Sequence, residues 1–340
     1  MLTDSSFPLL HPCVTTRRSA SDVIAEDDAC VLRFHGESAD LVEQLVPLLT
    51  GNSAVSEIAG NCGASSKSSV QHLEQLRLDG MLVDAEAIVA ADSCDRALAS
   101  VRELSVFWNR SIRQHPFPTR LFNGKATREE VLGWAIEFYF FIRAANSYMA
   151  RGVAVVDGET EALRPLWNHY VEESDHDRIF RQGLLDSGVP EPMIRTRRPI
   201  PGTRALVEYL WETGGNDPML YAATFAVMQP LEQPPSRERI REKYTALRAH
   251  YPFASGVFDA FERHDVIDAD LGHCELLLEP VLRRRWPLSA YERRRLQTVL
   301  RETAEHFIWF MEGIQRRYRS PTEIDYRPPP NAYGVFLQQA

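Results

Sequence analysis

The spacing of hydrophobic residues changes twice within the first 90 residues. Short apolar runs separated by polar turns, in LLHPCVTTRR, SDVIAEDD and ACVLRFHG, predict three β-strands up to about residue 35. From there to Gly80, apolar residues recur every three or four positions, which predicts three helices that end at glycines. The sequence MLVDA then predicts a closing strand. We therefore expect a small α+β, winged-helix-like domain over residues 1–90.

Helical periodicity dominates the rest of the chain. A polar, alanine-rich junction covers residues 84–100, and apolar residues then recur at helical spacing as far as residue 317. Prolines and glycines fall mainly between the periodic segments, where they interrupt helices. The sequence predicts a mainly α-helical domain over residues 100–317 and a proline-rich C-terminal tail over 318–340. The predicted helical segments are 98–114, 127–150, 159–187, 202–213, 217–231, 236–249, 254–283 and 288–317.

The overall composition excludes several classes of protein. A chain of 340 residues is long enough for two domains, and its net charge of −9 argues against a nucleic-acid-binding surface. No apolar run approaches the roughly 18 residues that indicate a membrane helix. Five cysteines without a CxxC pair are typical of a reducing compartment, and the N-terminus lacks the pattern of a signal peptide. We expect a cytoplasmic protein that binds neither nucleic acid nor membrane.

The N-terminal domain resembles a known class of peptide-binding domain. The order helix, short helix, helix and strand in LLTGNSAVSEIAGNCG and VQHLEQLRLDGMLVD is similar to that of the PqqD-like domains, the recognition elements of ribosomally synthesised and post-translationally modified peptides (RiPPs). The resemblance implies that the leader of a precursor peptide pairs with an edge strand near residues 30–35 and packs on the third helix near residues 66–79. The alternative is a domain that only packs or forms a homodimer.

The helical domain resembles a family of oxidases. The stretch HPFPTRLFNGKATREEVLGWAIEFYFFIRAAN (115–146) is similar to the opening of pyrroloquinoline quinone synthase (PqqC-like proteins), and residues 251–280 are similar to a late helix of the same family. Residues 166–189 resemble the middle helix of heme-oxygenase-like diiron oxidases. The resemblance covers about residues 100–317 and implies a heme-oxygenase-like helical bundle.

Three groups of polar residues are candidates for metal ligands. Glu173 and His176 stand three positions apart, and Asp270 and His273 repeat this carboxylate-x-x-His spacing on another helix. Glu137 is a lone acid among aromatic residues, where an ionised carboxylate is costly unless it is paired or bound to a metal. Two such pairs and a further carboxylate approximate the ligand set of a diiron or dimanganese bundle. Oxygen and imidazole ligands suit iron(II), with open positions for O2.

Each candidate also has a simpler interpretation. A carboxylate-x-x-His pair on an exposed helix arises often by chance, and Glu137 could pair with Arg143 instead. Diiron members of the resembled family usually carry a second ligand histidine a few residues after the glutamate of the first helix. Phe140 and Ala144 occupy those positions here.

Two further histidines could complete the set. His264 and Asp268 form an HxxxD pair, which on an ideal helix points to a different face from Asp270 and His273. A distorted turn could bring His264 to the metal beside those two residues. His169 lies one turn before Glu173 and could add a nitrogen. The number of metal ions, one or two, stays open.

These candidates support one leading hypothesis and two alternatives. The leading hypothesis is an iron-dependent, O2-using oxidase or oxygenase that modifies a ribosomally synthesised precursor peptide in natural-product biosynthesis. In it, the catalytic residues are Glu137, Glu173, His176, Asp270 and His273, with His264 and His169 as additional ligands. One alternative is a cofactorless, PqqC-like oxidase in which histidines act as acids and bases. The other is a non-catalytic scaffold that delivers a peptide to partner enzymes.

Overall fold

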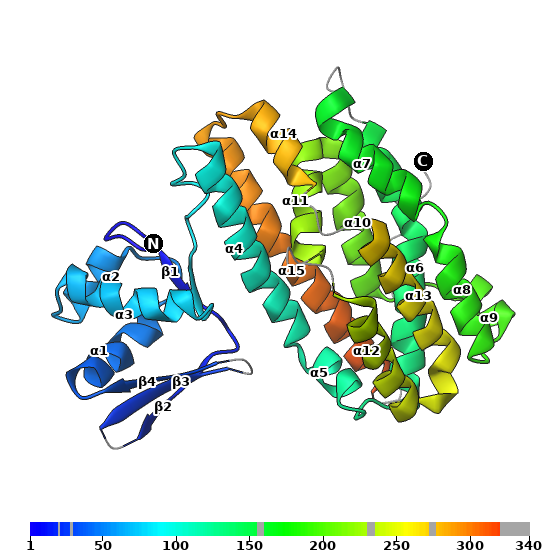
Figure 1. Cartoon of the computed structure of the whole chain (residues 1–340), viewed down its shortest axis with the longest axis horizontal. Helices are drawn as coiled ribbons and strands as arrows, with labels where there is room; N and C mark the ends of the chain where they lie inside the picture. Colours follow the sequence, from blue (N-terminus) through cyan, green and yellow to red (C-terminus); the bar gives the residue numbers. More distant parts are fainter. Residues whose placement is uncertain (20, 28–29, 155–159, 230–234, 272–276, 320–340) are drawn as a thin grey trace, which may run out of the picture.

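The structure is a computed structural model that describes residues 1–319 apart from 20, 28–29, 155–159, 230–234 and 272–276. The predicted proline-rich tail therefore lies almost entirely outside the described residues. Figure 1 shows a small N-terminal domain with strands and helices lying against one side of a larger helical domain, next to helix α4. The mainly α-helical class with a preceding small α+β domain, predicted from the sequence, is confirmed.

Two small antiparallel sheets and three helices build the N-terminal domain. The first predicted strand is divided in two: its beginning pairs with the closing strand, and its end joins a three-stranded sheet of order β2-β3-β4. The side chains of Phe34, Leu73 and Leu76 lie in the core between this sheet and the helices. The elements are β1 (Pro8–Leu10), β2 (Thr15–Ser19), β3 (Asp22–Glu26), β4 (Val31–His35), α1 (Glu37–Leu45), η1 (Val46–Leu48), α2 (Val55–Asn61), α3 (Ser66–Leu78) and β5 (Leu82–Asp84).

The helical domain is organised around one long buried helix, α6. Its neighbours are α7, α8, α10 and α15, and most of its side chains are buried on all sides. The elements are α4 (Cys94–Arg113), α5 (Pro116–Phe122), α6 (Arg128–Ala154), α7 (Thr160–Glu173), α8 (His176–Asp186), α9 (Glu191–Thr196), α10 (Pro201–Asn216), α11 (Pro218–Met228), α12 (Arg237–His250), η2 (Pro252–Ala254), α13 (Ser255–Leu271), α14 (Leu278–Arg285) and α15 (Ala290–Tyr318).

Two of the predicted helical segments are interrupted in the structure. The segment 159–187 divides into α7 and α8, because the chain leaves the helical path at Ser174 and Asp175. Hydrophobic periodicity continues across this break, so the sequence pattern did not reveal it. The segment 254–283 divides into α13 and α14, and residues 272–276 between them lie outside the described part of the chain.

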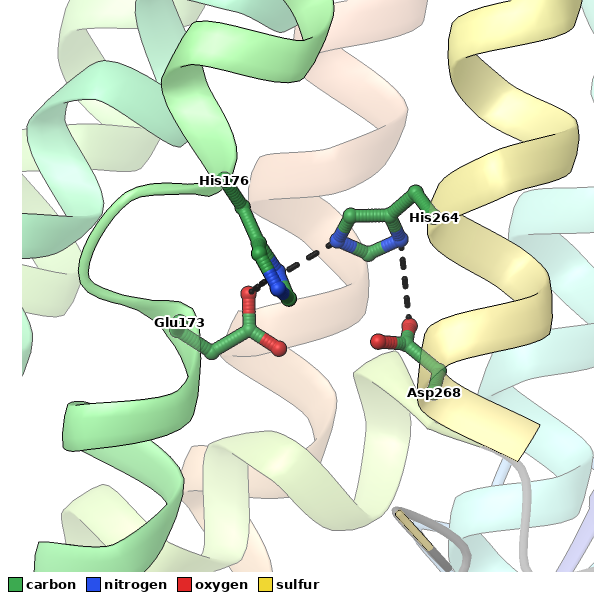
Figure 2. Close-up of side chains that lie close together, drawn as sticks. All are labelled: Glu173, His176, His264 and Asp268. Carbon is green, nitrogen blue, oxygen red and sulfur yellow. Dashed lines mark hydrogen bonds and ion pairs between the residues drawn. The ribbon is translucent and has the colours of Figure 1, made fainter. Parts of the chain in front are cut away.

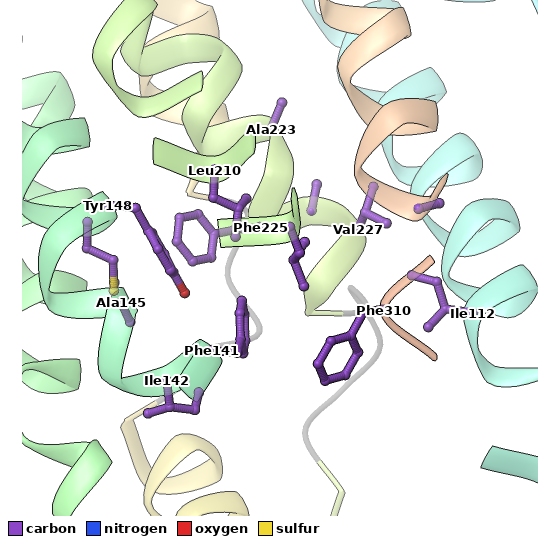
Figure 3. Packing of buried hydrophobic residues seen from close by; sticks show 14 of the residues in the cluster. Ile112, Phe141, Ile142, Ala145, Tyr148, Leu210, Ala223, Phe225, Val227 and Phe310 are labelled. Atoms are coloured by element: carbon purple, nitrogen blue, oxygen red, sulfur yellow. The ribbon is translucent and has the colours of Figure 1, made fainter. Parts of the chain in front are cut away.

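Aromatic side chains fill much of the core around α6. Trp134 stacks on Phe261 of α13, with ring centroids 4.5 Å apart and planes 14° apart. Figure 3 shows Phe141 and Tyr148 of α6 near Phe225 of α11, within the same buried cluster. Stacked and edge-to-face ring contacts of this kind hold the rings in defined orientations, and these rings also border the site described below.

Polar contacts join the N-terminal domain to α4. The Arg110 guanidinium donates to the Gly80 carbonyl at 3.1 Å and forms an ion pair with Asp27. Nε2 of the buried His11 lies 3.2 Å from the Phe107 carbonyl. Burial, together with the charge of Arg110, lowers the pKa of His11 to about 4. The imidazole of His11 is therefore neutral in the folded protein near neutral pH.

The low pKa of His11 predicts a loss of stability in mild acid. Its stabilising contribution is complete above the unfolded-state pKa of 6.5 and is lost as the pH falls towards the folded-state value of about 4. Between pH 6.5 and pH 5 we expect the free energy of unfolding to fall by about 2 kcal/mol from this group. Urea unfolding of wild type and His11→Gln at both pH values measures it. The fall in the free energy of unfolding should be smaller in His11→Gln and as large as in the wild type in His35→Gln. The same fall in His11→Gln as in the wild type would contradict the prediction.

Candidate metal site and adjoining cavity

Four side chains from three helices converge beside α6. One oxygen or nitrogen atom from each of Glu173, His176, His264 and Asp268 lies within 4.8 Å of the others, and Figure 2 shows the four side chains pointing toward one another. Glu173 is the last residue of α7 and His176 is the first residue of α8. His264 and Asp268 lie one turn apart on α13. The group thus forms where the α7–α8 break meets one face of α13.

Close packing of α8 against α13 sets the distance between the two halves of the group. A Cβ atom added at Gly183 of α8 would lie 2.6 Å from the Cβ of Ala260 and 2.7 Å from the Gly256 carbonyl oxygen. Contacts that short do not occur, so only glycine allows the two helices to approach this closely. The small residues at this crossing therefore position His176 opposite His264.

The two histidines share one oxygen of Glu173. His176 Nδ1 lies 2.7 Å from Glu173 Oε2, and His264 Nε2 lies 3.6 Å from the same oxygen. The ring centroids of the two histidines are 4.8 Å apart. The other nitrogen of His264, Nδ1, lies 3.1 Å from Asp268 Oδ2. His169 borders the group, with Nε2 at 3.7 Å from Glu173 Oε1.

The electrostatics of the group favour a positive charge between the carboxylates. Burial alone lowers the pKa of His264 and is the largest single influence, but the carboxylates of Asp268 and Glu173 outweigh it and raise the pKa to about 10. With both imidazoles neutral, two carboxylates leave a net charge of −2, which a divalent cation would neutralise. A metal ligand must be a neutral imidazole, so metal binding would displace the proton held by His264.

The donor set fits a divalent transition metal. Two imidazole nitrogens, from His176 and His264, and one carboxylate, from Glu173, match the two-histidine, one-carboxylate arrangement of non-haem iron(II) sites. Asp268 could hold Nδ1–H of His264, as outer-sphere carboxylates do for ligating histidines, or bind the ion itself. The residues that would hold the metal are therefore Glu173, His176 and His264, with Asp268 supporting or joining them.

The structure brings together part of the predicted ligand set. Glu173, His176 and His264 meet in one group, and His169 lies at its edge. Asp268, which the sequence indicated only as the HxxxD partner of His264, completes the group. His273 lies outside the described residues.

Asp270 does not reach the group, and its prediction as a ligand needs correction. Its side chain is exposed and bonds to Arg237, with distances of 2.6 and 3.1 Å. Helix α13 is regular through this region, so Asp270 points about 200° away from Asp268 around the helix axis. The HxxxD face points inward, and the predicted distorted turn is not needed.

Glu137 lies in a separate buried site, so its place in the predicted set also needs correction. Its carboxylate accepts hydrogen bonds from Tyr318 Oη at 2.7 Å, Thr203 Oγ1 at 2.7 Å and the Ile200 amide at 3.0 Å. Burial raises the pKa of Glu137 in spite of these bonds. The lone acid of the aromatic helix is therefore satisfied by three hydrogen bonds that join α6 to α10 and α15.

A cavity of about 330 Å³ adjoins the four-residue group. Glu173, His264 and Asp268 form part of its wall, together with the polar side chains of His169, Gln229, Lys243 and Asp265. Aromatic and aliphatic side chains from α5, α6, α11, α12, α13 and α15 form the rest. Burial, together with the charge of Glu173, raises the pKa of Tyr148 on the wall, so this residue stays a neutral phenol. The site therefore combines metal-ligand chemistry with a mostly apolar cavity.

The helical domain has the fold of a known class of proteins. It is similar to a TenA homologue from Pseudomonas syringae, with a TM-score of 0.50 and 13% identity over 64% of this chain and 92% of that one. It is also similar to a TenA family transcription regulator from Silicibacter sp., with a TM-score of 0.48 and 18% identity over 64% of this chain and 96% of that one. A domain of unknown function with a heme oxygenase-like fold from Shewanella denitrificans has a TM-score of 0.49 and 15% identity over 64% of this chain and 90% of that one. The similarity to the Pseudomonas structure shows that the helical domain has the fold of a TenA homologue, in agreement with the helical bundle predicted from the sequence.

The family itself follows from the sequence match. Residues 101–312, more than half of the chain, match the TENA/THI-4/PQQC family, and the chain belongs to this family. A comparison with curated proteins finds no match. None of the helices in the described part of the chain is long and apolar enough to span a membrane.

Proposed function

We propose that this chain is an iron(II)-dependent enzyme that uses O2 to oxidise a ribosomally synthesised precursor peptide. The observation that carries the proposal is the group of two histidines and two carboxylates beside a largely apolar cavity. Membership of the TENA/THI-4/PQQC family is compatible with an enzyme of this fold. The structure gives one four-residue group among the described residues, so we propose one iron ion for each chain.

The protein's own residues would bind the ion, orient its ligand side chains and exclude water. A bound iron(II) ion would supply oxidative chemistry with O2, because the proposed ligands leave positions open. Glu173, His176 and His264 would each supply one ligand atom to the ion. Asp268 would keep the proton on Nδ1 of His264, leaving Nε2 as the ligand atom. The buried aromatic wall would keep bulk water from the substrate.

A cofactorless oxidase is the second candidate, and the bonding of His264 favours it. Both nitrogens of this imidazole face carboxylates, and this arrangement could hold and transfer a proton to a substrate in the cavity. The two candidates differ in metal content. The protein purified from iron-supplemented cells should carry close to one equivalent of iron if the first is correct and should oxidise its substrate without metal if the second is correct.

Recruitment of the peptide is proposed for the free edge of β4. The Gly36 amide donates to the Ser21 carbonyl at 3.1 Å, and the Asp27 amide donates to the Cys30 carbonyl at 3.0 Å. Because hydrogen-bonded positions alternate along an antiparallel pair, the even-numbered residues of β4 bond to β3. The odd-numbered residues therefore direct their main-chain groups to the outer edge.

That outer edge is available to a further strand. No described strand pairs with the outer side of β4, where Val31, Arg33 and His35 present their main-chain groups. The ring centroids of Phe34 in β4 and His72 in α3 are 6.3 Å apart, so α3 runs close to this strand. An added leader strand would thus bond to β4 and contact α3, as strand addition to a sheet edge requires. The likeness to PqqD-like domains remains a prediction.

Arg33→Pro is expected to weaken leader binding about fivefold to tenfold. Proline removes the outward amide of Arg33 without breaking a bond to β3, and one hydrogen bond contributes roughly 1 kcal/mol. Fluorescence anisotropy with a labelled precursor peptide measures the affinity. Thr16→Pro, at an outward position on the opposite edge strand, is the matched control. Equal affinities for both variants would leave the domain a packing or dimerisation role.

A further inference from the structure

We propose that the cavity beside the four-residue group accepts one large, uncharged side chain of the substrate, aromatic or branched aliphatic. This inference rests on the proposed function for its role in a reaction, but the binding preference itself can be measured without metal or turnover. It follows from the composition of the cavity wall, the pairing of its charges and its size.

Aromatic rings dominate the wall. Trp134 and Phe138 of α6 contact the ring of Phe261 of α13, and Phe307 of α15 lies edge-on to Phe141 with ring centroids 5.7 Å apart. Figure 3 shows Phe141, Ala145 and Tyr148 on one helix, with Ala145 as the smallest residue among them. Rings held in fixed orientations offer edge-to-face and offset contacts to another ring, and apolar surface to an aliphatic group.

Each charged group of the described wall already has a partner. Lys243 Nζ lies 3.0 Å from Asp265 Oδ2, and Tyr244 donates to the same carboxylate at 2.7 Å. The carboxylates of Glu173 and Asp268 face His176 and His264. A charged substrate group would have to break one of these pairs or enter without a partner, which is costly in a mostly apolar site. An uncharged group would lose no such bond.

The size and opening suit a single side chain. A volume of about 330 Å³ is close to the lower end of the range for small-molecule sites, roughly 300–1,000 Å³. Among the described wall residues, Phe122 and Lys243 are exposed, with Phe122 at 50% and the Lys243 side chain at 41%. We infer that the side chain enters between these two residues and that its end lies near Glu173 and His264.

Binding of side-chain analogues to the metal-free, full-length protein tests this inference. Isothermal titration calorimetry with 3-methylindole, p-cresol and isobutanol samples uncharged side chains, and n-butylammonium and propionate sample charged ones. We expect the aromatic analogues to bind at least about tenfold more tightly than either charged analogue, because charged groups lose hydration without gaining a partner. Equal or tighter binding of a charged analogue would overturn the inference.

Variants assign the binding to this cavity. Ala145→Leu should fill part of the cavity and weaken binding of 3-methylindole at least about tenfold, since the added branch occupies space that the ligand needs. Ala144→Leu is the matched control, because Ala144 is a half-buried neighbour on the same helix that does not line the cavity. It should change the affinity less than about twofold. Unchanged binding in Ala145→Leu would place the ligand elsewhere and reject the proposal.

A second variant covers the case in which Ala145→Leu fails to fold. Phe307→Ala enlarges the cavity instead of filling it and should shift the preference from p-cresol towards the larger 3-methylindole. No shift would count against the cavity as the binding site. These binding results are independent of the metal. Analogue binding without iron uptake would support the proposed side-chain cavity and contradict the proposed iron enzyme. Iron uptake without analogue binding would support the iron enzyme and contradict the side-chain cavity.

Discussion

Replacing His264 by alanine is expected to lower the affinity for iron(II) by more than about 100-fold. His264 would supply one of two imidazole ligands, and loss of even an outer-sphere partner commonly costs 10–100-fold in metal affinity. Anaerobic titration with iron(II), followed by metal analysis of the desalted protein, measures the change. Far-UV circular dichroism establishes that the helical content is retained.

Two carboxylates on the same helix provide a matched comparison. Asp268→Ala should weaken iron binding by about 10–100-fold, because Asp268 holds or joins His264 in the group. Asp270→Ala should leave it unchanged, because this side chain faces solvent and bonds to Arg237. Equal iron binding by the two variants would contradict the assignment, and a selective loss in Asp270→Ala would restore the ligand set first predicted from the sequence.

Replacing Glu137 by alanine is expected to lower the free energy of unfolding by about 3 kcal/mol or more. The substitution leaves three buried donors, from Ile200, Thr203 and Tyr318, without their acceptor, and each such group costs roughly 1–3 kcal/mol. These bonds hold the start of α10 and the end of α15 against α6. Urea unfolding monitored by circular dichroism measures the loss.

The iron stoichiometry of the same variant separates a structural role from a ligand role. Glu137→Ala that still folds at low temperature should bind iron as the wild type does. Tyr318→Phe, which removes one of the three bonds, should cost roughly 1 kcal/mol and serves as the graded control. A stable Glu137→Ala protein that no longer binds iron would place Glu137 at the metal.

The sequence predicted the fold well because the signals were local and strong. Helical periodicity with glycines and prolines between the segments predicted the helical domain, and strands bounded by turns predicted the smaller one. The break between α7 and α8 was not predictable in this way. Apolar spacing continues through residues 159–187, and the turn at Ser174 and Asp175 contains no proline or glycine.

The candidate site was predictable only in part, for two physical reasons. Spacing identifies which residues share a helix face, and this placed His264 with Asp268. It also paired Glu173 with His176, but these two residues lie on different helices and meet across the turn at Ser174 and Asp175. Spacing does not say which of two faces of α13 points inward, so the sequence favoured Asp270 rather than Asp268 as a ligand. Nor does it reveal partners distant in sequence: the acceptor role of Glu137 depends on Tyr318, which is 181 residues away.

The position of a bound metal tests the central claim most directly. Crystals of the protein loaded anaerobically with iron(II), measured on both sides of the iron absorption edge, would locate the ion by its anomalous signal. The account predicts one strong peak about 2–2.3 Å from a carboxylate oxygen of Glu173 and from an imidazole nitrogen of each of His176 and His264. A fully loaded crystal with its peak elsewhere, or protein that takes up no iron under these conditions, would contradict it.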